Sequence, residues 1–218
     1  MTAGQLALFL PVALLLALIP GPDNLAVLAL SISRGRRLGL GFALGCAAGC
    51  LNHTVLSMIG VAALLSASPA ALWLLKTGGA LYLAWIGWQS LRAAGAAPHD
   101  ETAPAPALAP AAERFATGFR RGLFANALNP KVGLFFLAFL PQFVSPQGWP
   151  APWQLGVLGV CFTLCSALVF VLIALAASGL GGVLRQRPGV RRALDAVAGC
   201  VFVGLALRLL ASDLPARG

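Results

Sequence analysis

Long apolar runs separated by short polar intervals dominate the sequence and predict six membrane-spanning helices. The runs cover, approximately, residues 6–33, 38–67, 70–91, 118–140, 154–184 and 190–210. Each is long enough to cross a hydrocarbon core about 30 Å thick. The first and fourth runs contain internal prolines, which remove helical hydrogen bonds. The pattern therefore predicts an all-α polytopic membrane protein in which the first helix of each half is broken.

Arginine falls in alternate intervals and predicts how the chain crosses the membrane. Clusters occur at residues 34–37, 92–121 and 185–192, whereas the intervals 66–69 and 141–153 contain no Lys or Arg. Because positive charge favours the cytoplasmic side, both termini are expected outside the cytoplasm. Three spans per half then give two inverted repeats, residues 1–92 and 118–218. An Ala/Pro-rich segment, residues 93–117, is predicted to be a cytoplasmic linker between them.

The first break, Pro20-Gly21-Pro22-Asp23-Asn24, is the most unusual stretch of the chain. It places a carboxylate and an amide inside an apolar span, where polar groups are costly. If Asp23 caps a new half-helix that starts at Asn24, free backbone N–H groups gather there with the positive end of the helix dipole. Such parts can form a site for a small zwitterion. The alternative is a kinked helix in which Asp23 only caps the kink.

The second break, Asn129-Pro130-Lys131, occupies the corresponding place in the second half. Asn129 suits an N-cap and Pro130 the first helical position, which puts Lys131 in the first turn. The helix dipole disfavours a cation there, so we expect an anion nearby, either Asp23 or a substrate carboxylate. The alternative is a lysine that extends to the membrane interface. Asn126, on the same span, is expected to hold helices together.

Three further features of the spans bear on function. His53 lies near the middle of the second span, where it can relay protons or remain neutral and hydrogen-bonded to a neighbouring helix. Gly41, Gly45 and Gly49 recur every four residues and predict close approach of another helix. The five cysteines form no CxxC motif and are expected to be small apolar packing residues.

Composition narrows the function classes. Hydrophobic residues make up 59% of the 218 residues and the net charge is +9. The basic residues cluster between apolar runs as topology signals, so no nucleic acid partner, enzymatic activity or cofactor is expected. A transporter is favoured; a membrane thiol–disulfide carrier would need reactive cysteines near the breaks, and a metal-ion exporter would need clustered metal ligands. No Cys is near either break in sequence, and no metal site is predicted.

Several motifs together resemble the LysE/RhtB family of amino-acid exporters. They are Pro20-Gly21-Pro22-Asp23-Asn24, the glycine- and aromatic-rich stretch 78–88, Phe119-Arg120-Arg121-Gly122-Leu123, Asn129-Pro130-Lys131 and Leu140-Pro141-Gln142-Phe143. The resemblance implies a bacterial inner-membrane exporter of amino acids or their derivatives, driven by proton antiport and often dimeric. In this reading Pro22, Asp23 and Asn24 bind the substrate ammonium. Asn129, Pro130 and Lys131 bind its carboxylate. Asp23 and His53 are the candidates for proton coupling.

Overall fold

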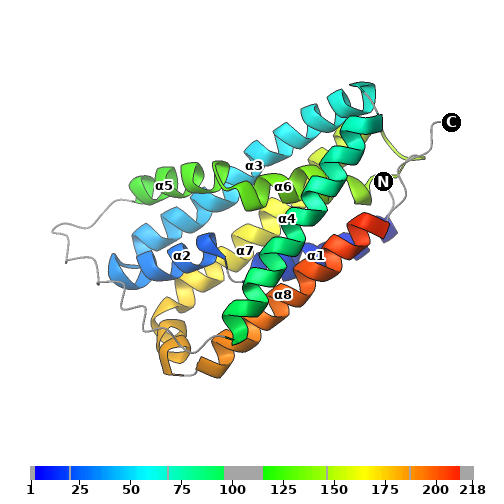
Figure 1. The fold of residues 1–218 in the computed structure, drawn as a ribbon. Helices are drawn as coiled ribbons and strands as arrows, with labels where there is room; N and C mark the ends of the chain where they lie inside the picture. Colours follow the sequence, from blue (N-terminus) through cyan, green and yellow to red (C-terminus); the bar gives the residue numbers. More distant parts are fainter. Residues whose placement is uncertain are drawn as a thin grey trace.

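The computed structural model describes residues 3–19, 21–67, 69–95, 115–145, 147–186 and 188–211, which form an elongated helical bundle (Figure 1). In chain order the elements are α1 (Ala3–Leu18), α2 (Pro22–Ser33), α3 (Arg36–Ala67), α4 (Pro69–Gly95), α5 (Phe115–Ala127), α6 (Pro130–Ala138), the 3₁₀ helix η1 (Leu140–Phe143), α7 (Ala151–Gln186) and α8 (Pro188–Ala211). The described residues contain no strand, and the all-α prediction is confirmed. Most of the predicted linker at 93–117 lies outside them, as does Pro20.

Both expected helix breaks are present, and they are similar in angle. The helices on either side of the first break, Gly4–Leu18 and Pro22–Ser33, are bent by 54°. At the second break, Phe115–Ala127 and Pro130–Phe143 are bent by 53°. In each case the second helix begins with a proline, which fits the first helical position because its missing N–H has no partner to lose there.

The described residues support three to five membrane spans. Three helical segments are long and apolar enough by themselves, Arg36–Gly60, Ala151–Ala177 and Arg192–Ala211, and each bent pair adds one if counted as a single span. The predicted third span, α4, is 27 residues long but is not among these segments. The six-span inverted repeat therefore stays a prediction.

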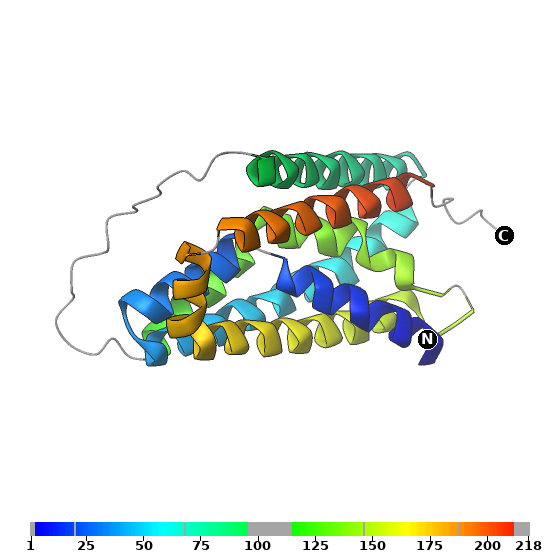
Figure 2. The same cartoon turned by 90° about the horizontal axis from the view of Figure 1, so that it is seen from below.

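Two groups of helices make up the bundle. The long helix α3 packs along α5 and α7, and α4 packs along α8. Figure 2 shows α4 and α8 as a layer on one side of the molecule, with α6 between this layer and α3. The start of α1 and the end of α8 lie at the same end of the bundle, opposite the α2–α3 junction and the end of α4 (Figures 1 and 2).

Glycines on α3 and α5 allow these two helices to touch through their backbones. A Cβ at Gly45 would overlap the carbonyl oxygen of Phe119 on α5, and one at Gly122 would overlap the carbonyl oxygen of Phe42 on α3. Gly41 and Gly118 make the same kind of reciprocal contact. The close approach expected from the glycine repeat is confirmed, and α5 is the partner.

An aromatic cluster fills the centre of the molecule. Phe135 on α6 lies 5.2 Å, centroid to centroid, from both Phe139 and Phe162, and Phe136 lies 5.2 Å from Phe162. Phe202 from α8 belongs to the same buried cluster. Large apolar side chains such as Leu164 and Leu172 on α7 remain more than half exposed, as expected of surfaces that face lipid. The cluster places α6, and with it the second break, at the centre of the bundle.

Candidate functional site

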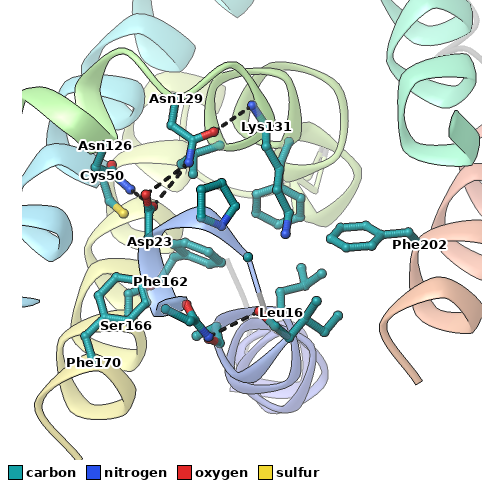
Figure 3. Close-up of a pocket in the computed structure, with 17 residues that line it drawn as sticks. Leu16, Asp23, Cys50, Asn126, Asn129, Lys131, Phe162, Ser166, Phe170 and Phe202 are labelled. Carbon is teal, nitrogen blue, oxygen red and sulfur yellow. Dashed lines mark hydrogen bonds between the residues drawn. The ribbon is translucent and has the colours of Figure 1, made fainter. Parts of the chain in front are cut away.

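The two helix breaks meet at a small cavity, which Figure 3 shows in close-up. At the second break, the side chain of Asn129 accepts a hydrogen bond of 3.0 Å from the backbone N–H of Lys131, which confirms Asn129 as the N-cap of α6. At the first break the prediction was wrong in detail. The helix begins at Pro22, its N-cap is Gly21, and Asp23 lies within the first turn, so the Asp23 carboxylate caps nothing.

The Asp23 carboxylate is held by two amides from the other half of the chain. Asn126 donates to Oδ2 at 2.7 Å, and Asn129 donates to both carboxylate oxygens at 3.2 Å. Asp23 is 9% exposed and Asn126 1%. Charge-assisted hydrogen bonds of this kind stabilise an ionised carboxylate away from water. The position of Asp23 near the N-terminus of α2 favours the same charge.

Asn126 is the partner of Asp23 whose role at the site sequence reasoning missed. It was expected only to hold helices together, which it does, but the group it holds is the carboxylate at the centre of the site. The available signal was its spacing, because residues three apart share one helix face and Asn126 precedes Asn129 by three. Gly49 on α3 makes room for it, since a Cβ there would come within 2.7 Å of the Asn126 Cβ.

The Lys131 ammonium points into the molecule and not toward a membrane interface. Its Nζ lies 4.6 Å from the centroid of the Phe202 ring on α8 and 3.0 Å from where a Cβ on Gly21 would be. The structure forms no ion pair within 4.0 Å between Lys131 and Asp23. The two side chains nevertheless line the same cavity. The sequence analysis expected an anion, either Asp23 or a substrate carboxylate, near Lys131.

Asn24 has a definite structural role. Its amide nitrogen donates to the carbonyl oxygens of Ala17, at 2.9 Å, and Ile19, at 3.2 Å, which lie at the C-terminal end of α1. These carbonyls lack partners within the helix, so Asn24 joins the two sides of the break. Asn24 and Pro22 also line the cavity, whereas Pro130 is exposed and does not. Substrate binding by these residues stays a prediction.

The cavity itself is small and mostly apolar. Its volume is about 60 Å³. Besides the polar residues of the two breaks, it is lined by Leu16, Val132, Phe135, Phe162, Phe170 and Phe202 and by Cys50 and Ser166. The presence of Cys50 corrects the expectation that no cysteine approaches a break, because α3 brings it there from a distant part of the sequence.

His53 is next to the site and not in it. It is 5% exposed, and its Nε2 lies 2.9 Å from the backbone carbonyl oxygen of Asn126. A carbonyl oxygen accepts only, so the proton is on Nε2. The His53 ring is therefore hydrogen-bonded to a neighbouring helix, α5, which is one of the two alternatives that the sequence left open. Its role in proton coupling stays a prediction.

Comparisons with known proteins agree with the resemblance in the sequence. A family profile described as LysE type translocator matches residues 14–213. A homoserine/homoserine lactone efflux protein of Salmonella typhimurium is 34% identical over 206 residues, covering 94% of each chain. A threonine efflux protein of Escherichia coli is 31% identical over 215 residues, covering 95% of this chain and all of the relative.

An uncharacterized membrane protein of Vibrio cholerae is 32% identical over 203 residues, covering 92% of this chain and 94% of the relative. No solved structure matches the chain. The family match covers nearly the whole chain. It includes both helix breaks and the residues Asp23, Asn126, Asn129 and Lys131. The protein therefore belongs to the LysE type translocator family.

Proposed function

We propose that this protein exports neutral amino acids from the cytoplasm and binds the substrate zwitterion between Asp23 and Lys131. The observation that carries the proposal is a buried carboxylate and a half-buried lysine ammonium that line one cavity without forming an ion pair with each other. A charge left unpaired at membrane depth costs about 3 kcal/mol or more. A zwitterion would supply an oppositely charged partner for each group at once.

The rest of the lining favours a neutral side chain on the substrate. Apart from Asp23 and Lys131 the cavity has no charged residue among those that the structure describes. The second charge of a basic or acidic amino acid would have no partner there and would keep its desolvation cost. Relatives named for efflux of homoserine, threonine and leucine support the same class.

Transport requires the cavity to widen. Small-molecule pockets typically measure about 300 to 1,000 Å³, so a cavity of about 60 Å³ is small for an amino acid. We infer that the substrate enters when the two breaks move apart and that the site closes around it. Movement of one helix group against another around a fixed site near the bilayer midplane is how inverted-repeat carriers alternate access.

The chemistry of Asp23 supports proton antiport as the coupling mechanism. A carboxylate that binds either a proton or the substrate ammonium, but not both, exchanges one for the other across the membrane. The partners of the Asp23 carboxylate, Asn126 and Asn129, are neutral amides and do not cancel its charge. The carboxylate can therefore still attract a proton or an ammonium group. His53, bonded to the carbonyl of Asn126, is the candidate to pass the proton onward.

Proteoliposomes loaded with labelled leucine, threonine and lysine test the proposal. An imposed pH gradient should drive efflux of the neutral amino acids and not of lysine. Asp23→Asn and Lys131→Gln should each abolish it, while Asp195→Asn, an acidic residue outside the cavity, should not. Full gradient-driven efflux by Asp23→Asn, or transport of lysine alone, would refute the proposal.

Neither alternative class gains support from the site. The described residues contain no group of three or more His, Cys, Asp or Glu placed to hold a metal ion. Cys50 lines the cavity, but none of the five cysteines forms a disulfide. Neither break sequence, 20–24 or 129–131, contains a cysteine. Transport by a variant without cysteines would exclude a thiol–disulfide mechanism directly.

A further inference from the structure

Phe202 on α8 contacts the Lys131 ammonium at the cavity. Its ring is 2% exposed, and Figure 3 shows it extending from α8 toward the end of the Lys131 side chain. Nζ lies 4.6 Å from the ring centroid, well within the range in which an ammonium is attracted to an aromatic face. The ammonium is thus partnered by a ring, although a carboxylate lines the same cavity.

Two features of the site bear on why the Lys131 ammonium contacts the Phe202 ring and forms no ion pair with Asp23. Both carboxylate oxygens already accept hydrogen bonds from Asn126 and Asn129. Lys131 also starts in the first turn of α6, where the helix dipole disfavours its charge. The side chain extends toward Phe202 on α8 and passes close to Gly21.

We propose that Phe202 is the resting partner of the Lys131 ammonium and that the carboxylate of an arriving substrate displaces it. The inference rests on the proposed function for the identity of the displacing group. A carboxylate binds an ammonium more strongly than a benzene ring does, because a charge-assisted hydrogen bond replaces an ion–quadrupole contact. Phe202 is then a positioning residue that acts on the substrate through Lys131.

Displacement of the Lys131 ammonium from Phe202 would affect both helices of the α4–α8 layer. The backbones of α4 and α8 touch, since a Cβ on Gly199 would lie 2.8 Å from the Gly87 carbonyl oxygen and one on Gly87 would lie 3.0 Å from that of Gly199. This contact joins α4 and α8 into one unit. Among the described residues, Phe202 is the side chain of this unit that lines the cavity. Release of the ammonium from the ring removes the cationic contact between this unit and α6.

The sequence makes a direct test practical because it contains two lysines, Lys76 and Lys131. In a Lys76→Arg background, protein labelled with [ε-¹³C]lysine gives one NMR signal. The ring current of Phe202 should shift the ε-methylene protons upfield in the substrate-free protein. Phe202→Leu should abolish that shift and Phe202→Tyr should keep it, whereas Phe162→Leu, which removes another ring from the cavity lining, should leave it in place.

Addition of leucine should move the wild-type signal toward the Phe202→Leu position, and leucinamide, which lacks the carboxylate, should not. An unshifted signal in the empty protein would overturn the contact, and a signal that stays in place while leucine is transported would overturn the displacement. If the shift depends on Phe202 but no neutral amino acid moves it or is transported, the proposed function fails and the resting contact stands.

Affinity gives a second readout of the same competition. Removing the ring takes away the partner that the substrate carboxylate has to replace, so Phe202→Leu should bind leucine about threefold to tenfold more tightly. Binding of leucinamide should not change by this factor. Weaker leucine binding by Phe202→Leu, with normal binding restored by Phe202→Tyr, would mean that the ring assists the bound state and would refute the displacement.

Discussion

Gly122→Ala tests whether the contact between α3 and α5 sets the geometry of the Asp23 site. An added methyl group would overlap the carbonyl oxygen of Phe42 and lie 2.8 Å from the backbone nitrogen of Cys46. Both neighbours are backbone atoms of α3, so no side chain can rotate out of the way. The helices must separate by on the order of 1 Å to reach normal contact distances.

The expected cost follows from overpacking against a rigid neighbour, which is typically about 1 to 3 kcal/mol. Alanine offsets at most about 1 kcal/mol of this, because it favours a helix more than glycine does. Gly204→Ala on α8 is the matched control, because a Cβ there meets nothing within 4 Å. It carries the helix benefit without the clash, so the two variants should differ in stability by roughly 2 kcal/mol.

Stability can be measured by reversible unfolding in mixed detergent micelles, and function by efflux from proteoliposomes. Gly122 precedes Asn126 by one helical turn, so separation of the helices should also draw the Asn126 amide away from Asp23. We therefore expect Gly122→Ala to be less stable and slower in transport than Gly204→Ala. Equal stability and equal transport in the two variants would refute the link between the glycine contact and the site.

Four other predictions concern Asn126, His53, the cysteines and the membrane topology. Asn126→Leu should slow efflux about tenfold to a hundredfold, since it removes one hydrogen bond to a charged group, and initial rates at matched protein levels measure this. His53→Gln keeps an N–H donor for the carbonyl of Asn126, so it should insert normally; if His53 couples protons, substrate exchange should continue while the response to a pH gradient is lost. Replacement of all five cysteines should preserve transport, with membrane insertion checked in parallel. Reporter fusions at Pro104 and at the carboxyl terminus should report opposite sides of the membrane, and the same side for both would contradict the six-span topology.

The helices and their breaks were predictable because the signals are local. Apolar length indicates a membrane span, and proline at the first helical position accounts for the starts of both α2 and α6. The N-cap role of Asn129 is equally local and was predicted correctly. Asp23 was harder, because an acidic residue near a helix start can cap the helix or follow the cap, and the extended Gly21 before Pro22 decides between these.

The partners of the charged groups could not be predicted, because they depend on how distant helices pack. Cys50 reaches the cavity only because α3 packs against α5 and α7. Phe202 is one of 12 phenylalanines in the chain, and no spacing in the sequence distinguishes it from the others. Asn126 had a local signal in its spacing from Asn129, but the group it binds lies 103 residues away.

The two breaks are alike in geometry and complementary in chemistry. Each begins a helix with proline, and the bends differ by a single degree, 54° against 53°. In α2 the first turn carries an acid, which the helix dipole favours, and two amides hold it still. In α6 the first turn carries a lysine, which the dipole disfavours, and among the described residues its ammonium lies against the Phe202 ring and close to Gly21. The acid is therefore the fixed charge of the site and the lysine the movable one. In the mechanism that we propose, a zwitterion that binds Asp23 through its ammonium would draw Lys131 onto its carboxylate, and the substrate itself would supply the free energy for rearranging the second break.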